Sequence, residues 1–265
     1  MGRITKRLLG IWIVLLPVIL FQSCAPVPRR PSPPLGESEL AAILANFEDQ
    51  ERRVRTCFGS GHLSIETADG EEDVNALVVA QKDPFRAKLE ITHPWGSPVL
   101  HLYADDTVIE AVAFPLKRVY RGRPEDVLLP KWLPLPLDPD LIWTLVRGFP
   151  MLAKHVRAES PAGDEIRLLG EDDGVVQIIA FQRESAFPIQ VSFPGTGATI
   201  FFSALEDSDG IQNARKVRVL YSGTGAALEL ELRERVFNQP VPSALFELTA
   251  PPHFERRQIL LHQAD

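Results

Sequence analysis

Hydrophobic and polar residues alternate with a period of two along most of this chain. The clearest run is 228–232, where leucines at every second position are separated by glutamates. Leu89 and Ile91 belong to a second such run, and turn-forming pairs such as Asp105-Asp106 separate neighbouring runs. Such alternation is typical of antiparallel strands with one face buried and the other in water. We therefore expect a mainly β protein of about eleven strands joined by short turns. In the second half of the chain, the expected strands are 166–170, 175–183, 189–193, 199–205, 216–221, 228–236 and 243–252.

Near the start of the chain the hydrophobic period changes to three or four residues. Leu40, Ile43 and Phe47 share one side of a helical projection, and charged residues lie largely on the other side. This spacing predicts an amphipathic helix. Ser38 is a suitable N-cap, and the pattern continues to about Thr56.

The middle of the chain, residues 122–150, contains six prolines among apolar residues. Asp138 followed by Pro139 is a typical helix start, and Gly148 is a typical helix end. We expect a short helix near 124–129 and a second helix near 139–147. The apolar content of this insert is too high for a solvated loop.

The N-terminus carries three basic residues, Arg3, Lys6 and Arg7, and then an apolar run over residues 8–21. This run is shorter than the roughly 20 residues that cross a bilayer, and its length suits a signal peptide. The segment ending at Cys24 resembles a bacterial lipoprotein signal peptide of residues 1–23. That resemblance implies cleavage before Cys24 and attachment of lipid, palmitate included, to this residue. Secretion without lipid and an uncleaved anchor are the alternatives.

Residues 24–36 are rich in proline and predict an extended tether between the anchor and a domain at 37–265. Inner-membrane lipoproteins often have aspartate after the modified cysteine, whereas this chain has Ala25. By that resemblance, we expect residence at the outer membrane on its periplasmic side.

The charge balance limits the possible partners. The net charge is −7, and it becomes −10 when the three basic residues of 1–23 are removed. An acidic protein is a poor partner for nucleic acid. It also has no electrostatic attraction to anionic lipid, so membrane attachment must come from acyl chains. Of the two cysteines, Cys57 remains after Cys24 is assigned to lipid; it is either a small buried residue or a reactive thiol.

The order of these elements, together with several local sequences, resembles the LolA/LolB superfamily of bacterial lipoprotein carriers and receptors. Residues 59–65 look like the first strand of that family. Residues 85–102 look like its third and fourth strands with the loop between them, and 245–252 look like its closing strand. The resemblance covers nearly all of residues 37–260. It implies a half-open antiparallel β-barrel with an N-terminal helix and a helical lid at 122–150. The expected lipoprotein signal peptide before Cys24 makes the chain look more like the membrane-anchored LolB type.

The same resemblance implies a cavity for acyl chains between the sheet and the helices. Its expected lining residues are Leu89, Ile91, Leu141, Ile142, Trp143 and Leu145. The alternative is that these residues fill an ordinary core. The loop Pro94-Trp95-Gly96 matches the position of a protruding loop that helps LolB-like proteins to deliver lipoproteins into a membrane, and tryptophan favours bilayer interfaces. Alternatively, the Trp95 ring folds back on the barrel edge.

No pattern in the sequence indicates an enzyme. No histidine pair has the i, i+4 spacing of a zinc protease, and no G-x-S-x-G sequence is present. Residues 195–197 and 223–225 are predicted hairpin turns rather than phosphate-binding loops. We expect no catalytic residue, metal or cofactor.

The expected function is that of a monomeric lipoprotein that receives other lipoproteins from a LolA-like carrier and inserts them into the outer membrane. Two alternatives stay open. The protein could bind another envelope lipid or glycolipid, or it could be a structural envelope lipoprotein with a filled barrel.

Overall fold

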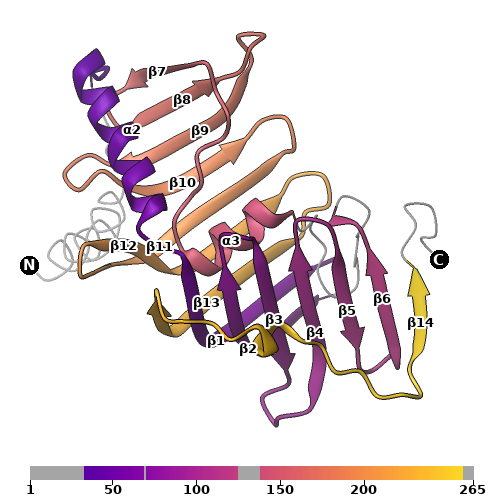
Figure 1. The fold of residues 1–265 in the computed structure, drawn as a ribbon. Helices are drawn as coiled ribbons and strands as arrows, with labels where there is room; N and C mark the ends of the chain where they lie inside the picture. Colours follow the sequence, from indigo (N-terminus) through magenta and orange to yellow (C-terminus); the bar gives the residue numbers. More distant parts are fainter. Residues whose placement is uncertain (1–32, 69, 125–137, 259–265) are drawn as a thin grey trace, which may run out of the picture. The chain divides into compact units, whose positions relative to one another are not determined.

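A single open sheet dominates the computed structural model, which describes residues 33–68, 70–124 and 138–258 (Figure 1). The sheet has fourteen strands in the described residues. They are β1 (Thr56–Thr67), β2 (Gly70–Gln81), β3 (Arg86–Thr92), β4 (Pro98–Asp105), β5 (Ile109–Ala113), β6 (Arg118–Gly122), β7 (Arg157–Ala162), β8 (Glu165–Leu169), β9 (Val175–Gln182), β10 (Phe187–Phe193), β11 (Ala198–Ser208), β12 (Ile211–Tyr221), β13 (Ala227–Phe237) and β14 (Glu255–Gln258). The helices are α2 (Glu37–Arg52), α3 (Pro139–Arg147) and the 3-10 helix η2 (Ser243–Phe246).

The strand order is β14-β6-β5-β4-β3-β2-β1-β13-β12-β11-β10-β9-β8-β7. The chain therefore builds one half of the sheet outward from β1 to β6 and returns through the other half from β7 to β13. The two halves join where β1 pairs antiparallel with β13. The sheet does not close, because β14 and β7 form its two ends.

The sequence correctly predicted a mainly antiparallel β-sheet, but it predicted too few strands. The expected count of about eleven is corrected to fourteen. The four residues of β14 are all polar, so no alternation marks them; the strand forms because the returning chain pairs parallel with β6. The expected strand at 243–252 is also wrong, since this segment begins with η2, from which Phe246 is buried.

One face of the sheet, which we call the inner face, carries the core. Cross-strand partners Leu63 and Leu230 lie on it, as do Leu89 and its partner Leu102. Because side chains alternate along a strand, this register places one apolar row from each of these paired strands on the same side.

Helix α2 begins one residue before the predicted Ser38 cap. Gly36 occupies the N-cap position with extended backbone and no side-chain hydrogen bond, so Ser38 lies inside the first turn. The helix ends at Arg52, earlier than the expected Thr56, which is the first residue of β1. Its buried Phe47 packs edge-on against the rings of Phe149 and Phe181.

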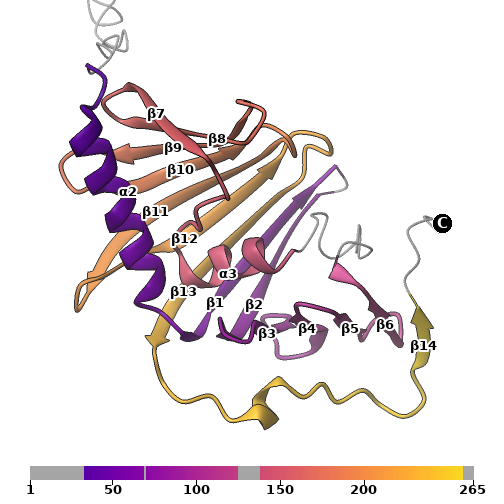
Figure 2. The same ribbon diagram turned by 45° about the horizontal axis from the view of Figure 1, so that its top comes forward.

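Helix α3 confirms the prediction for 139–147. The Asp138 carboxylate accepts a 2.7 Å hydrogen bond from the Leu141 amide, and Gly148 ends the helix with a φ of 67°. Both local signals therefore act as the sequence indicated. The helix lies across the inner face against β12, β13, β1 and β2 (Figure 2). The signal peptide, Cys24, most of the tether and nearly all of the expected helix at 124–129 lie outside the described residues.

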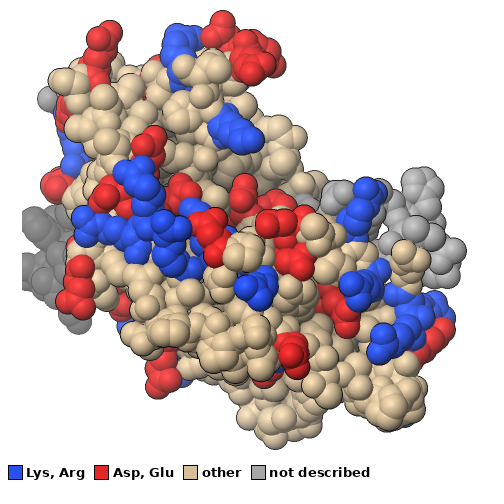
Figure 3. Space-filling model, viewed as in Figure 1, with Lys and Arg blue, Asp and Glu red and all other residues tan. Residues whose placement is uncertain are grey.

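Charged side chains of both signs are interspersed over the face shown in Figure 3. Many form cross-strand ion pairs, such as Lys216 with Glu229 at 2.8 Å and Arg218 with Glu66 at 2.7 Å. Half-exposed pairs of this kind are partly screened by water and contribute little to stability. None of the helices in the described ranges is long and apolar enough to cross a bilayer.

Candidate functional site

Helix α3 lies between two hollows on the inner face, and its side chains divide between them. Ile142, Leu145 and Val146 face one hollow, whereas Leu141 and Thr144 face the other. This division follows from helix geometry, because residues three or four apart share a face. The two hollows differ in size and in chemistry.

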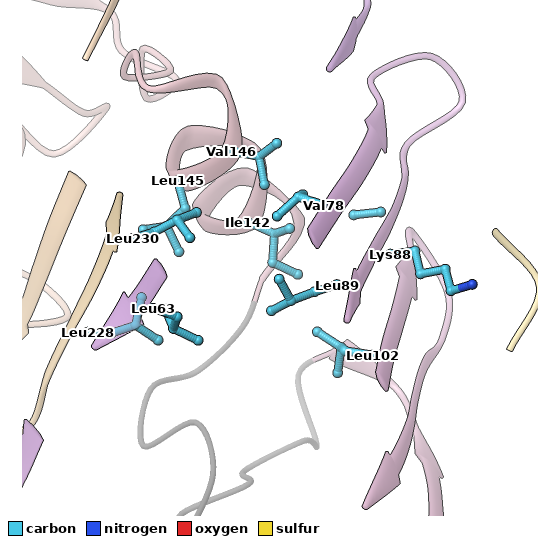
Figure 4. A pocket seen from close by; sticks show the side chains of 11 residues that line it. Leu63, Val78, Lys88, Leu89, Leu102, Ile142, Leu145, Val146, Leu228 and Leu230 are labelled. Carbon is cyan, nitrogen blue, oxygen red and sulfur yellow. The ribbon is translucent and has the colours of Figure 1, made fainter. Parts of the chain in front are cut away.

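The first hollow, which we call the sheet pocket, lies between α3 and the joint of the two sheet halves (Figure 4). Its lining residues are Leu63, Val78, Ala87, Lys88, Leu89, Leu102, Ile142, Leu145, Val146, Leu228 and Leu230. Lys88 is the single charged residue among them, and its amino group points away from the pocket and pairs with Glu90 at 2.9 Å. The lining residues that the structure describes therefore offer apolar contact alone.

The sheet pocket is almost filled by α3. Its volume is about 40 Å³, which is close to the space of a single water molecule. A ligand of any length enters this place only if α3 moves.

The second hollow, which we call the Thr144 pocket, is larger, with a volume of about 230 Å³. Its lining residues are Asp138, Asp140, Leu141, Thr144, Met151, Leu152, Ala153, Phe193, Thr196, Ala198, Ile200 and Tyr221. Apolar side chains form most of its wall, and the exposed Asp138 and Asp140 lie at its open side.

The C-terminal end of α3 is fixed to the rest of the fold. Arg147 is 1% exposed and donates hydrogen bonds to the carbonyl oxygens of Gln212 in β12 and Gln50 in α2. Its guanidinium also lies over the rings of Phe149 and Phe237. Burial, and next the charge of Arg235, lower the pKa of Arg147 to about 9, so the group stays protonated at neutral pH.

Cys57 is a buried residue beside this fixed end. Its thiol lies 3.6 Å from the carbonyl oxygen of Val146 and forms no disulfide. Burial raises the pKa of Cys57 to about 11, against the smaller opposing effects of Arg235 and Arg147. The thiol is protonated at neutral pH and is no nucleophile. Of the two alternatives from the sequence, the buried one is confirmed.

The six residues expected to line an acyl cavity fall into three groups. Leu89, Ile142 and Leu145 line the sheet pocket, and Leu141 lines the Thr144 pocket. Ile91 and Trp143 line neither, and both are almost fully buried. The structure thus brings three of the six together.

Trp95 projects from the loop between β3 and β4. The loop is closed by hydrogen bonds from the His93 amide to the Ser97 carbonyl and from the Gly96 amide to the His93 carbonyl, each 2.8 Å long. The indole is 74% exposed and stacks on the His93 ring at 4.4 Å. Pro94 and Gly96 are exposed beside it. The turn between β5 and β6 lies at the same end of the sheet and adds the exposed Leu116.

The sequence did not identify the wall of the Thr144 pocket. Met151 and Leu152 follow α3 without any periodic pattern, and their place is set by the buried Gln177. Its amide group donates to the Met151 carbonyl and accepts from the Ala153 amide, each at 2.9 Å. The alternation in β11 predicts that Ile200 faces inward. Which hollow it lines depends on where α3 packs, and this cannot be read from the sequence.

Comparison with known proteins shows the fold. No protein-family model matches the chain, and no curated protein sequence matches it. Among solved structures, it is similar to a DUF1329 family protein from Desulfovibrio piger, with 12% identity, a TM-score of 0.52, and coverage of 78% of this chain and 96% of that one. The two proteins share a fold.

Two further solved structures give slightly lower scores. A putative outer membrane lipoprotein-sorting protein domain from Vibrio parahaemolyticus has 11% identity and a TM-score of 0.48, covering 77% of this chain and 95% of that one. A LolA superfamily protein from Nitrosomonas europaea has 13% identity and a TM-score of 0.49, covering 78% and 97%.

Proposed function

We propose that this protein binds acyl chains on the inner face of its sheet, in the place that α3 now covers. One observation carries the proposal: Ile142, Leu145 and Val146 of α3 cover leucines of the sheet, and no polar group of the described residues faces the space between them. Burial of apolar surface contributes roughly 25 cal/mol per Å² whether the cover is a helix or an acyl chain. The two covers therefore compete for one surface.

Entry of an acyl chain requires α3 to move, because the sheet pocket holds only about 40 Å³. The hydrogen bonds of Arg147 and Gly148 hold the C-terminal end of the helix. The N-terminal end is held in the described residues by apolar contacts and its own cap. We expect the helix to lift from this end while its other end stays in place.

The wider role follows from the sequence resemblance to the LolB type. Cys24 would anchor the protein in the outer membrane, and the Trp95 loop would enter the bilayer interface during delivery. The exposure of Trp95 supports this part, since a ring 74% exposed is free to insert. The protein would act as a binding and transfer protein rather than an enzyme, with a LolA-like carrier as donor.

A titration tests the binding step. A fluorescent long-chain fatty acid is added to the acyl-free domain, and we expect saturable binding. Leu89→Gln, on the inner face, should weaken it. Leu77→Gln is the matched control, because Leu77 lies on the outer face of the neighbouring strand and is 49% exposed. Absence of saturable binding would favour the alternative of a structural lipoprotein with a filled core.

The cargo is tested separately. Lipids that co-purify with the protein from a bacterial envelope are identified by mass spectrometry. Lipoprotein acyl chains and capture of a LolA-like carrier support the LolB-type role. A glycolipid or other free envelope lipid would favour the transport alternative.

A further inference from the structure

The Thr144 pocket has the features of a site for one end of an amphiphile. Leu141, Met151, Phe193 and Ile200 form an apolar wall, and polar groups gather toward its open side. Its volume of about 230 Å³ exceeds the roughly 150 Å³ of an apolar cavity known to bind benzene. It can therefore hold part of an alkyl chain while α3 stays in place.

The charge at the open side has one sign. Of the described residues that line the pocket, Asp138 and Asp140 are carboxylates and none is basic. Neither carboxylate has an ion-pair partner in the described part of the chain. Asp140 is exposed, yet atoms packed around its carboxyl group, and next the charge of Asp138, raise its pKa. Two neighbouring carboxylates without a cation favour a positively charged ligand group.

Thr144 supplies an independent observation. The residue is 4% exposed and lines the pocket, and its hydroxyl has no hydrogen-bond partner among the described residues. The hydroxyl itself is not among the buried unpartnered atoms of the described residues, so it opens toward the pocket, where a ligand atom can complete its bonding. Thr144 lies one helical turn from Asp140, about 6 Å along the axis. The polar groups thus run inward from the mouth along one face of α3.

We infer that the Thr144 pocket binds an amphiphile whose polar end carries an ammonium group, held by Asp138 and Asp140, with a hydrogen bond to Thr144. This inference rests on the proposed function, because it assigns the head-group chemistry of an acyl-binding protein. The pocket wall is preformed, because the buried Gln177 side chain holds the backbone of Met151 and Ala153 by hydrogen bonds.

The test compares two probes with the same chain and opposite charge, dodecylamine and dodecanoate, by calorimetric titration below their micelle concentrations. We expect dodecylamine to bind about tenfold more tightly, which is the size of one charge-assisted hydrogen bond. The variant Asp138→Asn/Asp140→Asn should remove this preference, and asparagine at position 138 keeps the helix cap.

The control variant is Asp172→Asn/Asp173→Asn, which removes two charges from the exposed turn between β8 and β9. It should leave the preference unchanged. If the preference survives in the Asp138/Asp140 variant, or falls equally in both variants, the attraction is that of the acidic protein as a whole and the inference is overturned. Equal binding of both probes overturns the inference and leaves the proposed function standing. Binding of neither probe contradicts the proposed function itself.

Thr144→Val gives a second readout. Removal of an unpartnered hydroxyl should leave the free protein as stable or more stable, and it should weaken dodecylamine binding. Loss of stability with unchanged binding would show that Thr144 has only a structural role.

Discussion

The Ala214 amide of β12 donates a 2.7 Å hydrogen bond to the carbonyl oxygen of Gly148, directly after the last residue of α3. This bond fixes one end of the helix that covers the inner face. Together with the two carbonyl contacts of Arg147, it makes the C-terminal end of α3 the fixed end in any movement that exposes the sheet.

Gly148→Ala should destabilise the protein strongly, by about 3 kcal/mol or more. The residue has a φ of 67°, and an added Cβ would lie 2.3 Å from the Ala214 carbonyl oxygen. Gly225→Ala is the matched control, because it has a similar φ of 66° with open space around the added atom. It should lose only about 1–2 kcal/mol. Urea unfolding measures both, and equal losses would mean that α3 is not held tightly against β12.

Trp95→Ala should separate stability from delivery. The Trp95 ring is 74% exposed. Its removal should therefore change the free energy of unfolding by less than about 0.5 kcal/mol. Transfer of a lipoprotein to vesicles should fall sharply, whereas fatty-acid binding should stay unchanged. Val156→Ala, which alters an exposed apolar residue directly before β7, should affect neither. Normal transfer by the Trp95 variant would refute the insertion role.

Cys57 should make stability fall in alkaline solution. Its pKa is about 11 in the folded protein and near its ordinary value of 9.0 in the unfolded chain. Between these values the unfolded state holds fewer protons, so stability decreases as the pH rises from about 9 to about 11. The full contribution is about 2–3 kcal/mol. Denaturant unfolding across this range should show a flatter curve for Cys57→Ala, and parallel curves would contradict the assignment.

Cys24→Ala should release the protein from the membrane fraction. The resemblance to lipoprotein signal peptides implies that this cysteine is acylated, and the residues that the structure describes begin at position 33. The variant should bind fatty acid as the parent does and deliver lipoproteins less efficiently. Membrane fractionation and a ligand titration check the two parts, and retention in the membrane would mean that the anchor was misidentified.

Local signals explain which elements could be predicted. The cap at Asp138 and the terminator at Gly148 act within one turn of α3, and the alternation at 228–232 reflects a strand with one buried face. In contrast, β14 has no local signal, because its four polar residues pair with β6 only when the chain returns. The expected strand at 243–252 failed because the buried Phe246 contacts Arg86 through a short helical turn.

The candidate site was predicted only in part for the same reason. Leu89 and Ile91 share one face of β3, but α3 leaves a gap beside the first and the fold encloses the second completely. Neighbouring positions on α3, such as Leu141 and Ile142, face different hollows. A sequence pattern identifies an apolar face, whereas the division of that face into pockets depends on tertiary packing.

Photo-cross-linking with a diazirine-bearing palmitate, mapped by mass spectrometry, tests the central claim most directly. We predict adducts on the inner face and on the helix that covers it, at Leu63, Leu89, Leu102 and Leu145. Unlabelled palmitate should compete for them. Adducts confined to outer-face residues such as Leu77 and Val236, or labelling that unlabelled palmitate does not reduce, would contradict the claim that acyl chains and α3 share one surface.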